Sequence, residues 1–326
     1  MDSDLILQVE NLTVSFNTQR GLAKAVNNVN FELHKGEILG IVGESGCGKS
    51  VTSKSILKIL PSRIARIEGH IFYNNVDLLS LNEEKMERIR GNRISMIFQE
   101  PMVSLDPLFS IGEQLREVLQ THAGLNKNEA NQKVISVLNE VGIPSPEVRI
   151  KQYPFELSGG MRQRVMIAMG ILLHPDILIA DEPTTALDVT IQAQILQLLK
   201  NINQKYGTSI ILITHDLGII SEFADQVAVM YAGKIVEKAS SFEIFRNPLH
   251  PYTQGLMDSI PTMERLEGDL PSIPGIVPSI YNLPKGCAFC GRCPYAMNIC
   301  GQKDAPEQTC SSRMVKCWKY RKEPLS

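Results

Sequence analysis

The feature that most constrains this chain is a glycine-rich turn between an apolar strand and a helix. It reads Gly43-Glu-Ser-Gly-Cys-Gly48-Lys49-Ser50, which fits the spacing G-x-x-x-x-G-K-S. The strand predicted over Ile38–Val42 precedes it, and a helical pattern over Ser50–Leu60 follows it. Glycines let such a turn curl until its backbone N–H groups converge on phosphate oxygens, and the helix adds the positive end of its dipole. The segment is therefore predicted to bind the phosphates of a nucleotide.

Residues in this turn and just after it have separate expected roles. The ammonium group of Lys49 is expected to reach the β- and γ-phosphates, and the Ser50 hydroxyl is expected to be a ligand of Mg²⁺. Cys47 lies in the variable interior of the turn and receives no chemical role. The residues predicted to contact the nucleotide here are Gly43, Ser45, Gly46, Gly48, Lys49, Ser50 and Val51.

Two adjacent carboxylates follow a second apolar strand. The strand predicted over Ile177–Ala180 leads into Asp181 and Glu182, at the edge of an α/β sheet where ligands bind. An apolar run that ends in two carboxylates is common by itself, but together with a phosphate-binding turn it indicates nucleotide hydrolysis. Asp181 is expected to hold Mg²⁺, usually through water, and Glu182 is expected to polarise the attacking water as general base.

The segment Ser158–Gly160 offers a second anion-binding turn at the start of a helix. Taken alone it would be an ordinary helix cap, because serine is a good N-cap residue. One nucleotide does not need two such turns on one chain. We therefore predict that Ser158, Gly159 and Gly160 close over a nucleotide that a second protomer holds.

Alternating strands and helices along the chain predict an α/β core with a largely parallel sheet. Residues from about 81 to 160 carry few strand signals and are predicted to form a helical insertion. The predicted strands are Leu5–Val9, Leu12–Phe16, Ile38–Val42, Ile94–Phe98, Ile177–Ala180, Ile210–Thr214 and Val227–Tyr231. The predicted helices are Ser50–Leu60, Ile111–His122, Lys127–Val141, Met161–Leu173 and Val189–Tyr206.

Taken together, these motifs resemble those of ABC-type ATPases, and the resemblance covers residues 1 to about 245. Gln99 matches the family's Q-loop glutamine, which contacts Mg²⁺ and the attacking water. His215 matches the switch histidine that contacts the γ-phosphate, and Ala186-Leu-Asp188 matches the D-loop along the dimer interface. Phe16 takes the place of the aromatic residue that stacks on adenine, while residues 17–25 leave the exact aromatic open.

The resemblance implies a fold and a mechanism. The fold is an α/β P-loop NTPase core with an antiparallel β subdomain and a helical subdomain, plus a small loop-rich C-terminal domain. Two such ATPase domains close head to tail around two ATP molecules, and hydrolysis reopens the dimer. The implied catalytic residues are Glu182, His215 and Gln99, and the implied Mg²⁺ ligands are Ser50, Gln99 and Asp181.

Composition is that of an ordinary soluble protein. Hydrophobic residues make up 43% and charged residues 21%, and the formal net charge of −2 gives no argument for nucleic-acid binding. No apolar run approaches the roughly 18–20 residues that a spanning helix needs. Residues 1–10 lack the basic start and cleavage site of a signal peptide. The resemblance therefore implies a peripheral subunit at the cytoplasmic face of the cell membrane.

Two further stretches resemble the oligopeptide/dipeptide import group of these ATPases. One is Phe98–Pro107 around the Q-loop, and the other is Asn247–Thr253 with its His250-Pro-Tyr run, which physically reads as a turn before a helix. The group implies import of di- or oligopeptides, with nickel or another small solute as the alternative cargo. Its implied partners are two transmembrane permease subunits, a second ABC ATPase that is a paralogue, and an extracytoplasmic substrate-binding protein.

The rival from another class is a soluble ABC ATPase of DNA repair. Such proteins separate the two halves of the ATPase by long coiled coils or zinc modules. Here only the short insertion lies between the phosphate-binding turn and Ser158–Gly160, without sustained heptads or a strongly basic face. These features favour the transport subunit.

Residues 246–326 are predicted to form a separate loop-rich domain, after an ATPase domain over residues 1–245. Ten of the eighteen prolines lie between Pro248 and Pro324, which is incompatible with long helices or central strands. Six of the seven cysteines also lie here, from Cys287 onward. Without an export signal, such crowding favours a metal or cluster site over a disulfide framework.

The spacing of these cysteines leaves three states open. Dense thiolates suit a [4Fe–4S] cluster or Zn²⁺, and reduced or disulfide-linked thiols are the third reading. The pattern of peptide-importer ATPases implies that Cys290 and Cys310 are extra thiols or alternative ligands. Because the sequence shows no substrate-facing electron acceptor, the expected role of the site is structural, with redox sensing second. It implies the cluster ligands Cys287, Cys293, Cys300 and Cys317.

Overall fold

The computed structural model describes residues 4–100, 104–185, 187–260, 272–310 and 313–321. The chain divides into two compact units. Residues 1–33, 38–79 and 214–326 form the first unit, and residues 34–37 and 80–213 form the second. No helix in the described part of the chain is long and apolar enough to cross a membrane.

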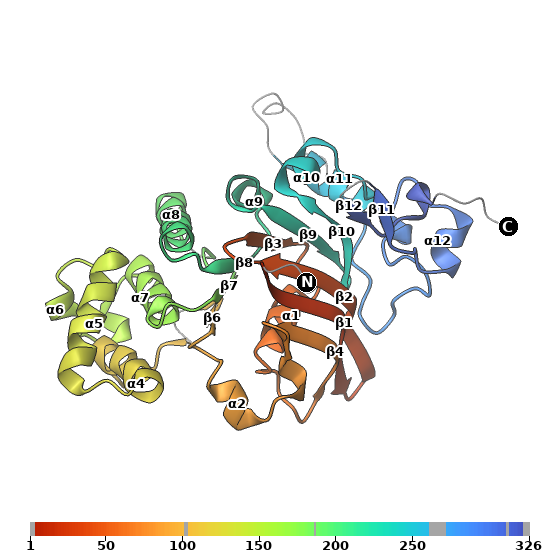
Figure 1. The fold of residues 1–326 in the computed structure, drawn as a ribbon. Coiled ribbons are helices and arrows are strands. Elements are labelled where there is room, and N and C mark those ends of the chain that lie inside the picture. Colours follow the sequence, from red (N-terminus) through yellow and green to blue (C-terminus); the bar gives the residue numbers. More distant parts are fainter. Residues whose placement is uncertain (1–3, 101–103, 186, 261–271, 311–312, 322–326) are drawn as a thin grey trace. The chain divides into compact units, whose positions relative to one another are not determined.

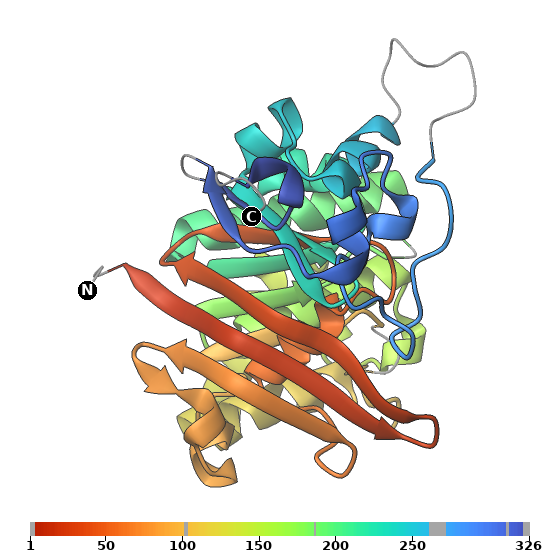
Figure 2. The ribbon, with the colours of Figure 1, turned by 90° about the vertical axis from the view of Figure 1, so that its right-hand side faces the viewer.

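The first unit contains an antiparallel sheet with the strand order β2-β1-β4-β5. Two long strands, side by side in Figure 2, dominate it, and β4 pairs with β1 in antiparallel register. Buried and less buried residues largely alternate along β1, as expected for a strand with one face toward a core. The strands are β1 (Leu5–Thr18), β2 (Gly21–His34), β4 (Ala65–Tyr73) and β5 (Val76–Asp77).

The same unit contains a second set of strands in the order β11-β12-β10-β9-β3. Only the β3–β9 pair is parallel; β9–β10, β10–β12 and β11–β12 are antiparallel. The C-terminal extension, residues 246–326, therefore adds the two strands β11 and β12 to this sheet. The strands are β3 (Ile38–Val42), β9 (Gln226–Tyr231), β10 (Lys234–Ser240), β11 (Gln308–Cys310) and β12 (Arg313–Val315).

Short helices complete the first unit. Those of the extension are brief, as its prolines predict. The helices are α1 (Lys49–Ile56), α9 (Leu217–Phe223), α10 (Ser241–Arg246), α11 (Pro251–Asp258) and α12 (Asn298–Gln302), with 3₁₀ turns at Leu78–Ser80, Cys290–Arg292 and Trp318–Tyr320.

The second unit combines three parallel strands with a group of helices (Figure 1). The strands, in the order β8-β7-β6, are β6 (Ile94–Ile97), β7 (Ile177–Asp181) and β8 (Ser209–Thr214). All residues of β7 and β8 are buried, as expected for parallel strands. The helices are α2 (Glu83–Glu87), α4 (Ile111–Ala123), α5 (Lys127–Glu140), α6 (Pro146–Arg149), α7 (Gly159–Ile171) and α8 (Val189–Tyr206), with a 3₁₀ turn at Pro154–Glu156.

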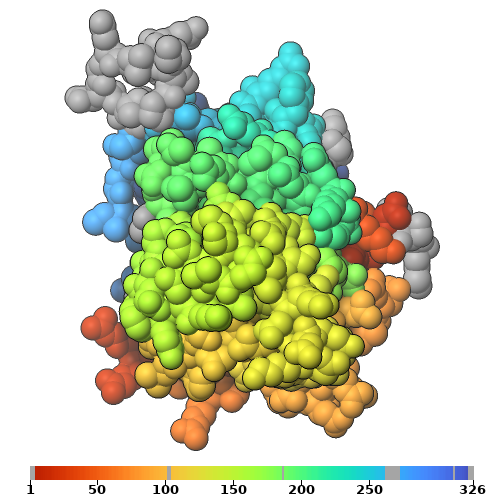
Figure 3. All heavy atoms as spheres, turned by 90° about the vertical axis from the view of Figure 1, so that its left-hand side faces the viewer, coloured from red at the N-terminus to blue at the C-terminus, as the bar shows by residue number. Residues whose placement is uncertain are grey.

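Local signals explain where these helices begin and end. Ser110 and Glu113 form a capping box at the start of α4, and Asn126 and Glu129 form another at the start of α5. Gly207 adopts the left-handed conformation that closes α8. Side chains of residues in α4, α5 and α6 form a continuous surface in Figure 3, in yellow and yellow-green.

The predicted strand–helix alternation is confirmed, but β2, β4, β5, β10, β11 and β12 are not among the predicted strands. Two predicted elements also differ in extent. The predicted strands Leu5–Val9 and Leu12–Phe16 are one strand, β1, whose register shifts between Glu10 and Thr13. Asn11, at that shift, has a φ of 52°, which asparagine tolerates better than most residues. Helix α1 ends at Ile56 rather than Leu60.

Candidate functional site

The phosphate-binding turn in the first unit requires glycine for steric reasons. Gly43 follows the fully buried strand β3 and has a φ of 154°. A Cβ atom at Gly43 would lie 2.1 Å from the Met230 carbonyl oxygen, which no real Cβ tolerates. Gly48, with a φ of 106°, begins α1, and a Cβ there would lie 2.6 Å from the Ala25 carbonyl oxygen. The turn thus packs directly against neighbouring backbone, and only glycine fits at positions 43 and 48.

Lys49 is buried at the first position of α1. Its ammonium group donates to the carbonyl oxygens of Gly43, at 2.7 Å, and Glu44, at 3.1 Å. The cation is therefore held at the turn where phosphate is predicted to bind. Ser50 and Val51 follow in the same first helical turn, while Ser45 and Gly46 are exposed at the bend.

The second unit brings Gln99 and Glu182 together, as the sequence predicts. The Gln99 side-chain amide donates to Glu182 Oε2 at 3.1 Å, and the Thr185 hydroxyl donates to the same oxygen at 2.9 Å. Glu182 has a φ of 48°, and its N–H donates to the Ile213 carbonyl oxygen at 2.8 Å. Asp181, at the end of β7, is almost fully buried. Two polar side chains, those of Gln99 and Thr185, thus orient the predicted general base.

Thr185 is a functional candidate that the sequence reasoning missed. Its signal was present, because a hydroxyl three residues after Glu182 can reach back across a tight turn. Ala186, in the predicted D-loop, lies outside the described residues. Asp188 of that loop caps α8, because its carboxylate accepts the Ile191 N–H at 2.9 Å.

Ser158 caps α7 in the second unit. Its hydroxyl accepts the Met161 N–H at 3.3 Å, so the cap predicted from the sequence is present. Ser158 and Gly159 are exposed and Gly160 is half-buried. The start of α7 therefore lies at the surface.

The remaining predicted nucleotide contacts lie in the first unit. His215 is exposed directly after β8, and Phe16 is half-buried near the end of β1, opposite Ala65. The first unit therefore carries the phosphate-binding turn, Phe16 and His215. The second unit carries Gln99, Ser158–Gly160, Asp181 and Glu182.

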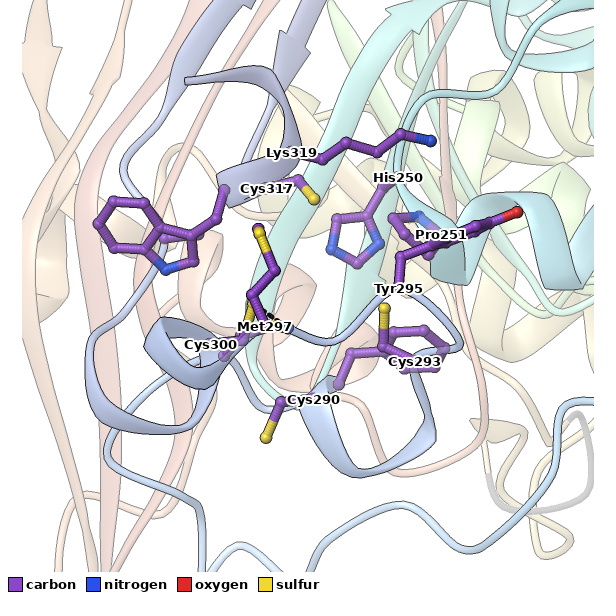
Figure 4. Close-up of a pocket in the computed structure, with 13 residues that line it drawn as sticks. His250, Pro251, Cys290, Cys293, Tyr295, Met297, Cys300, Cys317 and Lys319 are labelled. Atoms are coloured by element: carbon purple, nitrogen blue, oxygen red, sulfur yellow. Dashed lines mark hydrogen bonds between the residues drawn. The ribbon is translucent and has the colours of Figure 1, made fainter. Parts of the chain in front are cut away.

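A separate pocket lies in the C-terminal extension, and most cysteines of the extension line it. It is partly open to solvent. Cys310, on β11, does not line it. In Figure 4 the Cys290 sulfur points away from those of Cys293 and Cys317. The thiols that line the pocket belong to Cys287, Cys290, Cys293, Cys300 and Cys317.

Burial favours the protonated form of three of these thiols. Burial, with smaller contributions from neighbouring cysteines, raises the pKa of Cys287 to about 12. Burial likewise raises the pKa of Cys293 and of Cys317. In the described part of the chain no group of three or more potential ligands is already arranged to hold a metal ion. The donor chemistry nevertheless suits a soft metal centre, since five cysteines line one pocket.

The His250-Pro-Tyr run connects this extension to the sheet. His250 caps α11, since its Nδ1 accepts the Tyr252 N–H at 3.1 Å, and the predicted turn before a helix is confirmed. The N–H groups of Leu249 and His250 each donate to the Glu237 carboxylate at 2.8 Å. Arg313 pairs with the same fully buried carboxylate at 2.9 Å. The run is therefore a structural junction.

Comparisons with known proteins agree with this geometry. The ABC transporter family model matches residues 26–185, and the model for the C-terminal region of oligopeptide/dipeptide transporters matches residues 236–300. The chain is 52% identical over 316 residues to the dipeptide transport ATP-binding protein DppD of Bacillus subtilis, covering 96% of this chain and 94% of the relative. It is 46% identical over 323 residues to the oligopeptide transport ATP-binding protein OppD of Escherichia coli, covering 99% and 96%.

Solved structures give the same class. A dimeric post-hydrolysis structure of the ATP-binding cassette MJ0796 with ADP and Pi is similar at a TM-score of 0.65 and 27% identity, covering 72% of this chain and 99% of that one. The fold and the phosphate-binding turn thus define an ABC-type ATPase. This chain belongs to the family of ATP-binding subunits of ABC transporters, in its oligopeptide/dipeptide group. It is an ATPase coupled to transport.

Proposed function

We propose that this chain hydrolyses ATP to power the import of di- and oligopeptides. The carrying observation is that the similarity to dipeptide and oligopeptide transport ATP-binding proteins runs through the ATPase motifs and the C-terminal extension alike. An extension match over residues 236–300 favours this group over a general ABC ATPase. It also disfavours the DNA-repair reading.

The proposed mechanism assigns each motif one task. The backbone of the Gly43–Ser50 turn and the Lys49 cation hold the phosphates of ATP, while Ser158–Gly160 of a second ATPase subunit closes over the γ-phosphate. Gln99 and Thr185 orient the Glu182 carboxylate, which takes a proton from the attacking water. His215 contacts the γ-phosphate in this scheme, and Phe16 stacks on adenine.

Mg²⁺ would be held by oxygen donors, which is the chemistry it prefers. The donors offered are the Ser50 hydroxyl, the Asp181 carboxylate and the Gln99 amide. The ion would neutralise charge on the β- and γ-phosphate oxygens.

Replacing the proposed base separates binding from hydrolysis. Glu182→Gln should retain ATP binding and lower kcat by at least about 100-fold, because a general base contributes that much or more. Size-exclusion chromatography with ATP should show an ATP-loaded dimer of the variant. The control is Glu117→Gln, which changes an exposed carboxylate on α4. Rapid turnover by Glu182→Gln would remove Glu182 from this role.

The proposed membrane partners are two permease subunits, which receive peptides from an extracytoplasmic binding protein. The second unit offers an apolar surface for such a contact. Leu108 is 79% exposed and Phe155 is 64% exposed, and the rings of Tyr153 and Phe155 stack at 5.6 Å. Backbone bonds from Ile111 and Gly112 to the 150–152 segment join these two stretches. Exposed apolar side chains such as these are typical of a protein interface.

The partner ATPase is proposed to be a paralogue rather than a second copy, and the complex is proposed to lie at the cytoplasmic face of the cell membrane. Co-purification of the intact complex, followed by identification of its chains, tests both statements. Two different ATPase chains with two permeases are the expected result. A single ATPase species would contradict the paralogue.

Cargo is tested with the reassembled complex in lipid vesicles. Uptake of a labelled dipeptide or oligopeptide should require ATP and this chain. Nickel uptake under the same conditions is the alternative outcome and would contradict the peptide proposal.

We also propose that the cysteine pocket holds a [4Fe–4S] cluster, with Zn²⁺ as the competing occupant. Four thiolates would hold it, and a bound cluster would cross-link the extension. The structure favours Cys290 over Cys310 as an alternative ligand, because only Cys290 lines the pocket. The proposed ligands are Cys287, Cys293, Cys300 and Cys317.

Anaerobic purification tests this occupant. The protein should be brown, with a broad visible absorption band and iron in it. Cys317→Ser should lower the iron content strongly, while the matched change Cys310→Ser should not. A colourless zinc-containing protein would contradict the cluster.

A further inference from the structure

The C-terminal extension contacts the phosphate-binding turn through an ion pair between Arg292 and Glu44. Arg292 Nη1 lies 2.8 Å from Glu44 Oε2, and Nη2 lies 3.0 Å from Oε1. The Arg292 side chain is 7% exposed and that of Glu44 is 27% exposed. Two parallel charge-assisted bonds with little exposure to water form a strong and directional contact.

The Arg292 guanidinium is held from its other side as well. Its Nε donates to the Pro274 carbonyl oxygen at 2.9 Å, and Nη2 donates to that of Ile273 at 3.2 Å. Nη1 donates to the Tyr231 hydroxyl at 3.3 Å. All five N–H groups of the guanidinium therefore have an acceptor, so its position is fixed by the extension and the sheet.

Tyr252 holds the backbone of the same turn. Its hydroxyl oxygen accepts the Glu44 N–H at 2.9 Å. The ring is fully buried, with its centroid 4.6 Å from that of Tyr231 and 5.5 Å from that of Phe289. Tyr252 of the His250-Pro-Tyr run and Arg292 of the cysteine-bearing segment thus both contact Glu44.

The contacts of Arg292 and Tyr252 with Glu44 also affect the position of Lys49. Its ammonium group donates to the carbonyl oxygens of Gly43 and Glu44, the residues at which the turn is anchored. A shift of Glu44 would move both acceptors and the cation with them. The position of Lys49 therefore depends on contacts that the extension makes.

We propose that Arg292 and Tyr252 are positioning residues of the ATP site. They hold the start of the turn, and through it Lys49, in the geometry that binds phosphate. Arg292 lies in the 3₁₀ turn Cys290–Arg292, directly before Cys293, so the extension supports ATP binding without touching the nucleotide. This role concerns ATP alone and stands whichever solute the complex carries.

Single substitutions test the proposal on the full-length chain. Arg292→Gln and Tyr252→Phe should each weaken equilibrium binding of a fluorescent ATP analogue and raise KM for ATP, Arg292→Gln by roughly tenfold. The value of kcat should change much less, because the general base is untouched. Arg292→Lys should recover part of the affinity. The matched control is Asp304→Asn, which breaks the ion pair of the same extension with Lys234.

A double-mutant cycle separates positioning from general stability. Glu44→Gln should weaken ATP binding about as much as Arg292→Gln, and the double variant should be no weaker than either single variant. If Arg292→Gln does not fold, the ATP affinities of Glu44→Gln and Tyr252→Phe test the proposal instead. The proposal is overturned if the folded variants bind ATP with wild-type affinity, if the two effects simply add, or if Asp304→Asn weakens ATP binding equally.

Discussion

The phosphate-binding turn and the C-terminal extension are ordered by opposite means. In the turn, Gly43 and Gly48 leave out side chains so that backbone can approach backbone. In the extension, helices and strands are short, and the order comes from side chains such as the buried Arg313–Glu237 pair. Close backbone approach at two glycines thus shapes the turn itself, whereas side-chain contacts order the extension. Substitutions should therefore damage them in different ways.

The largest expected effect is in the turn. Gly43→Ala would put a Cβ atom 2.1 Å from the Met230 carbonyl oxygen, so the strand or the turn must move. We expect a loss of about 4 kcal/mol or more in the free energy of unfolding, together with loss of ATP binding. Urea unfolding followed by circular dichroism measures the first, and equilibrium ATP binding measures the second.

Gly46→Ala is the matched control in the same turn. Gly46 also has a positive φ, 76°, but a Cβ atom there would meet nothing within 4 Å. Only backbone strain remains, at a cost of about 1–2 kcal/mol. Equal losses for the two variants would show that close backbone approach does not govern the turn.

The next largest effect is in the extension. Arg313→Met leaves the Glu237 carboxylate, which is 0% exposed, without its ion-pair partner. We expect a loss of about 3–5 kcal/mol in the free energy of unfolding, because an uncompensated buried charge is costly. Adding Glu237→Gln should recover part of the loss, because the amide is neutral but only its oxygen can accept a backbone N–H group. If the double variant is as unstable as Arg313→Met, packing rather than charge explains the effect.

The smallest effect is a pH dependence. Burial lowers the pKa of His250 to about 3, whereas an unfolded histidine has a pKa of about 6.5. The unfolded chain takes up the proton first, so this contribution to stability is complete above pH 6.5 and falls as the pH drops toward 3. The slope approaches about 1.4 kcal/mol per pH unit.

Urea unfolding at pH 7.5 and 5.5 measures this slope. His250→Asn, whose side-chain oxygen can still cap α11, should show a shallower dependence. If wild type and variant lose the same stability between these pH values, His250 is not the group responsible.

Most of the fold could be predicted from the sequence where burial is complete. The runs Ile38–Val42 and Ile177–Ala180 identified β3 and β7, because strands buried on both faces are continuous apolar runs. β2 and β4 were missed. Each exposes alternate residues, and in β4 the polar residues Arg66, Glu68 and His70 dilute the apolar signal.

In the candidate site, residues within local motifs could be predicted from the sequence, whereas residues that act through distant contacts could not. Gln99 and Glu182 were predicted from motifs that follow apolar strands, and the structure brings them within hydrogen-bond distance. Arg292 was not predicted, because its partner Glu44 lies 248 residues earlier and no local spacing encodes such a pair. The sequence singles out Tyr252 only as a member of the His250-Pro-Tyr run that resembles the oligopeptide/dipeptide group, and it does not predict a contact with the turn.

The long sequence separation between the turn and its supports has a consequence for synthesis. The spacing that binds phosphate is complete by Ser50, yet the parallel neighbour of β3 is β9, at Gln226–Tyr231, and Arg292 comes later still. Contacts between such distant residues form slowly and only when both have been made. We therefore expect a ribosome-bound chain to acquire firm nucleotide affinity only near the end of translation.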